Sequence, residues 1–251
     1  MRMERQMEIL GLLRNTNMVQ IKDLSHRLRV SQNTIRRDLK RLEEEGLVTM
    51  THGGAVGVRN APMGMPLGVR EDQYAEEKLR IGKKAAEFIQ DGDAVILDAG
   101  TTTERVVPGL KDRRNLTVIT NGLNIALGLL GIPGVTPILV GGIINDTTFC
   151  TAGFHAEEFL RQFHVNTAFI SAGGVTVEGV MNTNAFEVRI KQSMIQAADK
   201  VVLVVTGEKI GKTSLAPFAG LEEIDVVVTD GKAPPEEVER LRRRGVEVVL
   251  C

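Results

Sequence analysis

From residue 94 to the C-terminus, short runs rich in Val and Ile recur along the chain, and segments with helical periodicity lie between them. The seven runs cover residues 94–97, 116–119, 137–140, 167–170, 201–205, 226–228 and 246–250. Most are apolar at nearly every position, which is typical of strands buried on both faces of a parallel sheet. The helical segments include 123–130, 156–163, 187–198 and 235–244. This alternation predicts an α/β domain with a Rossmann-like, mostly parallel sheet.

The first 58 residues follow a different pattern, centred on a basic helix that we expect over residues 31–42. Ser31 is a good N-cap, and Ile35, Leu39 and Leu42 are spaced three and four apart, so they form one apolar stripe. A solvated surface helix would look similar, so the flanking segments must decide. The residues away from the stripe are amides and cations, the types that hydrogen-bond to base edges and phosphates: Gln32, Asn33, Arg36, Arg37 and Lys40.

The flanking segments complete the pattern of a winged helix-turn-helix. Residues 5–13 and 20–28 have helical periodicity, and the turn at 29–31 leads into the basic helix. Two strands are predicted at 47–51 and 55–58, joined by a tight turn at 52–54 that would form the wing. In such units the second helix of the motif lies in the major groove of DNA. We therefore expect residues 1–58 to bind double-stranded DNA.

The distribution of charge agrees with this division of the chain. The net charge is −1, which alone argues against a nucleic-acid-binding protein. Residues 1–60, however, hold 11 Lys and Arg against 7 Asp and Glu, a net of +4, while the rest holds 20 against 25, a net of −5. DNA should repel the acidic part, so we expect that part to have another task.

Residues 59–68 are rich in Gly and Pro and have no periodicity, so they predict a linker. The expected organisation is a DNA-binding domain at 1–58, a linker at 59–75 and an α/β domain at 76–251. The chain has two cysteines, no signal-peptide core and no apolar run near the roughly 18 residues of a membrane span. We expect a cytoplasmic protein that does not associate with membranes.

Small polar residues follow several of the predicted strands, where parallel α/β sheets bind their ligands. The segment 98–103, Asp-Ala-Gly-Thr-Thr-Thr, offers a glycine and three hydroxyls beside a helix start, which suits a phosphate. Residues 120–122, 141–142 and 171–174 follow other strands. A single Thr could merely cap the helix, and Lys209 could supply either a cation to the site or an ordinary surface charge. Four such strand ends together predict a shared site for a small polar anion.

The run Thr34-Ile35-Arg36-Arg37-Asp38-Leu39, followed by His52-Gly53-Gly54-Ala55, resembles the DeoR family of bacterial transcription regulators. The resemblance continues through 98–102, 120–121, 141–142, Gly153 and Lys191, so it covers nearly the whole chain. It implies a C-terminal domain similar in fold to ribose-5-phosphate isomerase, which senses phosphorylated sugars or related metabolites. Two positions depart from the family pattern: Met50 replaces a usual basic residue, and Thr206 replaces a common Asp.

The resemblance also implies function and site residues. We expect a repressor of carbohydrate-metabolism genes that needs no cofactor or metal and works as a homodimer or homotetramer through its effector-binding domain. The residues expected at the DNA operator are Ser31, Gln32, Asn33, Thr34, Arg36, Arg37, Lys40 and His52. The residues expected at the phosphorylated sugar are Asp98, Gly100, Thr101, Thr102, Thr103, Thr120, Asn121, Gly141, Gly142 and Lys209.

The main alternative is a sugar-phosphate isomerase with an appended DNA-binding domain. Isomerisation needs a general base, and no acid follows the strand ending at 171–175 until Glu178. Asp98 remains, but a lone acid at a strand end more often orients a ligand or the backbone. A nicotinamide-dependent enzyme would need Gly-x-Gly-x-x-Gly, which 98–103 lacks. The four histidines are scattered, which disfavours a metal site. These observations favour a regulator over an enzyme.

Overall fold

The computed structural model describes residues 2–16, 18–44, 47–51, 53–57, 70–71 and 73–251. The chain divides into two compact units, Met1–Met65 and Pro66–Cys251, and each is described by itself. His52, Gly46 and the expected linker at 59–68 lie outside the described residues.

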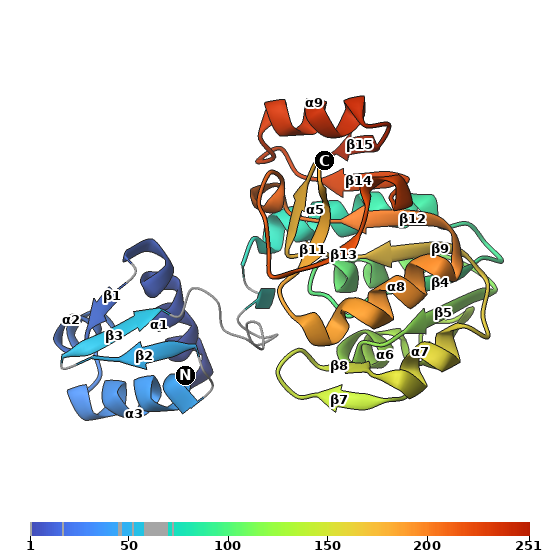
Figure 1. Ribbon diagram of the computed structural model, residues 1–251. Coiled ribbons are helices and arrows are strands. Elements are labelled where there is room, and N and C mark those ends of the chain that lie inside the picture. Colours follow the sequence, from blue (N-terminus) through green and yellow to red (C-terminus); the bar gives the residue numbers. More distant parts are fainter. Residues whose placement is uncertain (1, 17, 45–46, 52, 58–69, 72) are drawn as a thin grey trace. The chain divides into compact units, whose positions relative to one another are not determined.

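The N-terminal unit combines three helices with a small antiparallel sheet (Figure 1). Its elements are α1 (Arg2–Thr16), β1 (Met18–Gln20), α2 (Ile21–Arg27), α3 (Gln32–Glu44), β2 (Val48–Met50) and β3 (Gly54–Gly57). The strand order is β1-β3-β2, so the wing hairpin of β2 and β3 gains a third strand that we did not predict. Buried side chains from all three helices form the core: Ile9, Leu10, Leu13, Leu24, Ile35, Leu39 and Leu42.

The C-terminal unit is built on a seven-stranded sheet with the order β15-β14-β12-β9-β4-β5-β6. Every neighbouring pair is parallel, so the prediction of a parallel α/β sheet is confirmed. The seven apolar runs of the sequence supply its strands: β4 (Ala94–Leu97), β5 (Leu116–Thr120), β6 (Val135–Leu139), β9 (Val165–Ile170), β12 (Ala198–Val204), β14 (Val226–Thr229) and β15 (Glu247–Leu250).

Helices cover both faces of this sheet, because alternate residues of each strand point to opposite sides. On one face, Val95 and Leu97 pack against α5 (Ala75–Ala85), the 3₁₀ helix η2 (Thr103–Leu110) and α6 (Leu123–Leu129). On the other, Ile96 packs in the cluster formed with α7 (Phe154–Leu160), α8 (Val188–Gln196) and α9 (Pro235–Arg243). The helix expected at 156–163 begins two residues earlier and ends at Leu160.

Five further short strands were not predicted. β10 (Gly174–Thr176), β11 (Gly179–Asn182) and β13 (Ala216–Ala219) form a small antiparallel sheet. β7 (Ile143–Asn145) and β8 (Cys150–Ala152) form a separate hairpin, here called the arm, next to α7 (Figure 1). Short 3₁₀ turns complete the unit at η1 (Ala86–Phe88), η3 (Ala185–Glu187), η4 (Gly207–Lys209) and η5 (Leu221–Glu223). Within the described ranges, none of the helices has the length and apolar character needed to cross a membrane.

Candidate functional site

Helix α3 presents the predicted polar face to solvent. Ile35, Leu39 and Leu42 are buried, whereas the five polar residues opposite them are exposed: Gln32, Asn33, Arg36, Arg37 and Lys40. The N-cap prediction is confirmed, because the Ser31 hydroxyl accepts a hydrogen bond from the Thr34 backbone N–H at 3.2 Å. The structure thus leaves the row of amides and cations available to an outside partner.

A partly buried ion pair that sequence reasoning missed orients this helix. Asp38 lies on the buried side of α3, and its carboxylate accepts a hydrogen bond from the Arg5 Nε at 2.5 Å. Arg5 lies on α1, so the pair fixes α3 against α1 beneath the exposed face. On that face, Arg36 donates to the Asn33 side-chain oxygen at 3.1 Å, which aligns two of the expected base-contacting groups.

In the C-terminal unit the strand order reverses between β4 and β9. From β4, which comes first in the chain, β5 and β6 extend the sheet on one side, and β9, β12, β14 and β15 extend it on the other. The connections leaving two such strands run in opposite directions, and ligands of α/β sheets bind in the crevice that results. Asp98 follows β4 and Ser171 follows β9, so both lie at this switch point.

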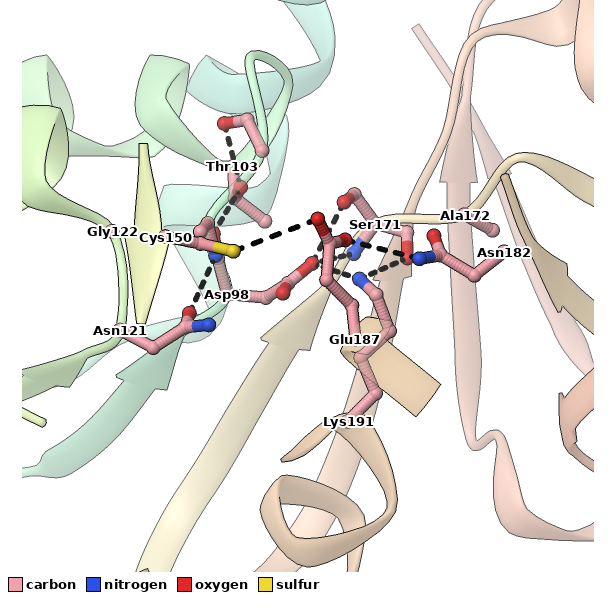
Figure 2. A network of polar contacts seen from close by, with 12 residues as sticks. Asp98, Thr103, Asn121, Gly122, Cys150, Ser171, Ala172, Asn182, Glu187 and Lys191 are labelled. Atoms are coloured by element: carbon pink, nitrogen blue, oxygen red, sulfur yellow. Dashed lines mark hydrogen bonds and ion pairs between the residues drawn. The ribbon is translucent and has the colours of Figure 1, made fainter. Parts of the chain in front are cut away.

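Asp98 is held there by a buried clamp (Figure 2). Its Oδ2 accepts hydrogen bonds from the Ser171 backbone N–H at 3.0 Å, the Ser171 hydroxyl at 2.7 Å and the Lys191 Nζ at 2.5 Å. Lys191, from α8, also donates to the Ser171 carbonyl at 3.0 Å and is fully buried. The clamp therefore uses the Asp98 carboxylate to join the ends of β4 and β9. The family resemblance included Lys191, but its partner lies 93 residues away, which no local pattern indicates.

A second buried carboxylate lies beside the clamp. Glu187 accepts hydrogen bonds from the Asn182 amide at 3.0 Å and from the Cys150 thiol at 3.5 Å (Figure 2). Burial, together with the nearby Glu187 charge, raises the pKa of Cys150 to about 12, so the thiol stays protonated and acts as a donor. Asp98 and Glu187 thus give this end of the site two carboxylates against the single Lys191 ammonium.

The expected phosphate loop, 98–103, is a tight turn leading into η2. Thr103 donates its hydroxyl to the carbonyls of Asp98 at 2.5 Å and Gly100 at 2.8 Å. A Cβ on Gly100 would lie 2.5 Å from the Ser171 hydroxyl oxygen, so only glycine fits against β9. Thr101 and Thr102 are also buried. Thr103 thus maintains the turn through its hydroxyl.

Thr120 and Asn121, after β5, brace this loop from the side. The Thr120 hydroxyl donates to the Leu97 carbonyl at 2.6 Å. The Asn121 side-chain oxygen accepts from the Ala99 backbone N–H at 2.9 Å, and its amide nitrogen donates to the Thr151 carbonyl at 3.0 Å. Both side chains are almost fully buried. Their polar groups bond to the protein's own backbone, which indicates a supporting position.

Several cations lie near one another around Lys78. Lys78, from α5, is buried, and its ammonium donates to the Arg70 carbonyl. Burial and the nearby charges of Lys209, Arg70 and Arg105 lower the pKa of Lys78 to about 7. Lys209 donates to the Ala172 carbonyl at 3.0 Å, next to the clamp. The Arg105 Nε is buried without a hydrogen-bond partner among the described residues.

Lys78 and Arg105 were not expected from the sequence, although one signal was present. Lys78 precedes Ile81, Gly82 and Ala85 by three, four and seven residues, and all four are buried on one side of α5. A lysine in the apolar stripe of a helix is unusual, because a buried ammonium is costly unless a partner compensates it. We name Lys78, Arg105 and Lys209 the cation cluster.

The remaining expected residues lie at the edge of the site. Gly141 and Gly142 are exposed in the turn between β6 and β7. Gly142 has a φ of 151°, and a Cβ there would lie 2.7 Å from the Ala152 carbonyl oxygen, so this glycine fits against the arm. Thr206, at the departure from the family pattern, is buried, and its hydroxyl has no hydrogen-bond partner in the described part of the chain.

The sequence matches the models of two domain families. Residues 5–60 match the DeoR-like helix-turn-helix domain, and residues 73–231 match the DeoR C terminal sensor domain. This chain belongs to the DeoR family of transcription regulators. The resemblance stated from its motifs is thereby confirmed, and the chain is a regulator, not an enzyme.

Named relatives align over most of their length. The transcriptional repressor AccR of Agrobacterium fabrum is 38% identical over 229 residues, which cover 90% of this chain and 89% of AccR. The regulator GlpR of Haloferax volcanii is 35% identical over 98% of this chain and 96% of its own. The repressor GlcR of Bacillus subtilis is 34% identical over 98% and 95%. Among solved structures, ribose 5-phosphate isomerase A of Methanocaldococcus jannaschii aligns with a TM-score of 0.39 and 15% identity over 54% of each chain.

Proposed function

We propose that this protein is a repressor of carbohydrate-metabolism genes whose affinity for its operator is controlled by a phosphorylated sugar. The observation that carries the proposal is the cation cluster beside Thr101 and Thr102 at the switch point of the sheet. Like charges brought together in a buried place destabilise a protein unless an anion compensates them. Burial first, and then the charges of Lys209, Arg70 and Arg105, lower the pKa of Lys78 to about 7 although Glu208 opposes the shift, so a bound anion would stabilise the charged ammonium.

The proposed ligand lies across the switch point. Its phosphate is held by the hydroxyls of Thr101 and Thr102 and by the cation cluster, and Gly100 allows the close approach of the backbone. The polyol part extends toward Glu187 and Asn182, because carboxylate and amide oxygens accept hydrogen bonds from sugar hydroxyls. Asp98, Thr103, Thr120 and Asn121 position these groups, and Gly141 and Gly142 border the site.

The proposed DNA contacts lie on the exposed face of α3 and on the wing. Ser31, Gln32, Asn33, Thr34, Arg36 and Arg37 face the bases, Lys40 contacts a phosphate, and His52 contributes from the wing turn. Two copies of the chain, as a homodimer or homotetramer, present two such helices to two half-sites. Residues 1–58 thus act as the DNA-binding domain, 59–75 as the linker and 76–251 as the sensor. We also propose a cytoplasmic location, where operator DNA is found.

The DNA contacts are tested with duplexes selected from a random library by the purified full-length protein. Arg36→Ala and Arg37→Ala should each weaken binding to the selected duplex by about 1–3 kcal/mol, because each removes a bidentate contact to a base. Lys111→Ala, an exposed site in the other unit, removes the same charge and is the control. If both α3 variants bind as tightly as the control, the recognition-helix assignment is wrong.

The effector site is tested by thermal unfolding in the presence of a panel of sugar phosphates and inorganic phosphate. A ligand of the folded state raises the midpoint progressively, with the logarithm of its concentration once that exceeds Kd. The stabilising compound should then change the affinity for the selected duplex, as linkage between the two sites requires. Stabilisation without any change in DNA affinity would contradict regulation by that ligand, and no stabilisation by any phosphate would contradict the site.

A further inference from the structure

One segment of the sensor unit is almost free of charge, although charged residues make up 25% of the chain. Between Leu116 and Ala156 the only Asp, Glu, Lys or Arg is Asp146. The segment includes β5, α6, β6 and the arm. Parts of it are solvent-exposed in the single chain, and exposed surface of a monomer normally carries many charges. The exposed parts of this segment are therefore unlike the surface of a protein that works alone.

Large apolar side chains are exposed on the arm and beside it. Ile143 is 65% exposed and Ile144 is 59% exposed. Neighbouring residues of a strand point to opposite sides, so at residues 143 and 144 neither side of β7 is covered by its own unit, whereas Asn145 is buried. The exposed apolar residues on the arm and next to it, with Ile143 and Ile144 on opposite sides of β7, are together named the arm face: Leu139, Ile143, Ile144, Phe149 and Phe154, all of them 44–68% exposed.

Contacts show that these residues belong to one region. Leu139 ends β6, and the turn at 141–142 leads directly into Ile143. A Cβ on Gly153, the residue before Phe154, would lie 3.5 Å from the Ile143 side chain. The Phe149 carbonyl accepts a hydrogen bond from the Leu123 N–H at 2.9 Å, which joins the tip of the arm to the start of α6. Apolar patches of this kind on a protein surface mark interaction sites.

The backbone of Phe149 supports the same conclusion. This residue has a φ of 53°, in the left-handed region that is unfavourable for a bulky side chain. The strained conformation leaves the ring 48% exposed, so the chain's own core does not explain it. Strain of this kind persists where the side chain has a task outside the local fold.

The β6 edge of the seven-stranded sheet is unsuited to pairing with a strand of another chain. β6 is the edge strand, and the Val140 N–H donates inward to the Thr120 carbonyl. By the alternation of a strand, the nitrogens of residues 137 and 139 point outward, and residue 137 is a proline without an N–H. A proline at that position blocks pairing at a sheet edge. A second copy of the chain therefore cannot add a strand at the β6 edge of the seven-stranded sheet.

We infer that the arm face joins two copies of this chain. A nucleic acid or a strongly charged protein would need complementary charges, which the segment 116–156 lacks. In a twofold interface the same patch of each copy meets the other, and the buried core of such interfaces is apolar and depleted of charged residues, which is the composition of the arm face. A regulator with one recognition helix per chain also needs a second copy to occupy two half-sites.

The inference gives a surface to the oligomer in the proposed function, and its test involves neither DNA nor effector. Light scattering after size-exclusion chromatography of the full-length protein should give a multimeric mass. The double variant Ile143→Asp/Ile144→Asp should dissociate at least about 100-fold more readily, because it places four carboxylates at a desolvated twofold contact. Leu215→Asp, at a site 58% exposed outside the arm face, should keep the wild-type mass.

A second measurement covers the case in which the double variant fails to fold. Amide exchange of the wild type is compared above and below the concentration at which it dissociates. Amides of 143–152 should lose protection on dilution, whereas those of α9 should not change. A monomeric wild type, an unchanged mass of a folded double variant, or protection of the arm that is independent of concentration would each overturn the inference. In any of these cases the proposed binding of DNA and phosphate would still stand.

Discussion

Two buried lysines of the candidate site have opposite surroundings. At one end the Lys191 ammonium meets the Asp98 carboxylate at 2.5 Å, and two groups of Ser171 complete the coordination. Elsewhere in the site Lys78 is buried near the charges of Lys209, Arg70 and Arg105. Burial and these charges lower its pKa to about 7. A buried charge with a partner stabilises the fold. A cluster of like charges is unfavourable in the free protein, and an anionic ligand would relieve that repulsion on binding.

The clamp end is tested by Lys191→Met, for which we expect the largest effect. Breaking a buried ion pair leaves an uncompensated carboxylate, which costs about 3–5 kcal/mol. The free energy of unfolding from urea titrations should fall by that amount. Lys212→Met removes a lysine from an exposed pair with Glu208 and should cost at most about 1 kcal/mol. If the free energy of unfolding falls equally in Lys191→Met and Lys212→Met, the buried pair of the clamp contributes no more to stability than an exposed pair.

The cation cluster is tested by Lys78→Met, which should have the opposite effect on stability. The folded protein should be as stable as the wild type or more stable, because the variant removes a desolvated charge. The affinity for the sugar phosphate that stabilises the wild type should fall roughly tenfold or more. Lys83→Met, on the exposed side of the same helix, should change neither property. A large loss of stability in Lys78→Met would show that this end is structural too.

The titration of Lys78 gives a pH dependence with a definite sign. Its pKa is about 7 in the folded protein against an ordinary value of 10.5, so between these values the unfolded chain binds more protons. Stability should therefore rise with pH across this window, by at most about 1.4 kcal/mol per unit, and level off above it. The slope is measured as the difference between the wild type and Lys78→Met. A difference that is flat or falls with pH would contradict the lowered pKa.

The same group should make ligand binding take up protons. A bound phosphate favours the charged ammonium, so at pH 8 the complex should bind close to one more proton than the free protein. Calorimetry in buffers of different ionisation enthalpy measures this number directly. The Lys78→Met variant serves as the control and should show a smaller uptake.

Thr102→Ala should produce the smallest effect. Removal of one hydrogen-bonding hydroxyl should weaken the binding of the sugar phosphate by about 1 kcal/mol. Stability and DNA affinity should remain near those of the wild type, because the substitution removes a single hydroxyl and no charge. A loss of stability as large as that of Lys191→Met would place Thr102 in the clamp.

The sequence predicts the fold well where local pattern decides it. Seven nearly continuous apolar runs predict strands of a parallel sheet covered on both faces, and all seven were found, two of them at the edges of the sheet. The five missed strands of the sensor unit are three or four residues long, and they exist because a distant strand pairs with them. Among the site residues, the glycine and hydroxyls of 98–103 were recognisable. The pairing of Asp98 with Lys191 and the grouping of Lys78 with other cations could not be recognised, because both depend on residues from distant elements.

The side-chain amide of Asn121 links the loop at 98–103 to the arm, which bears on whether ligand binding is cooperative between subunits. One side of this group holds the Ala99 N–H of the phosphate loop, and the other holds the Thr151 carbonyl of the arm. A ligand that shifts the loop therefore displaces the arm as well. If the arm face joins two copies, as inferred above, occupancy of one site should alter the next, so effector titrations of the assembled protein should be sigmoidal and those of the Ile143→Asp/Ile144→Asp variant hyperbolic.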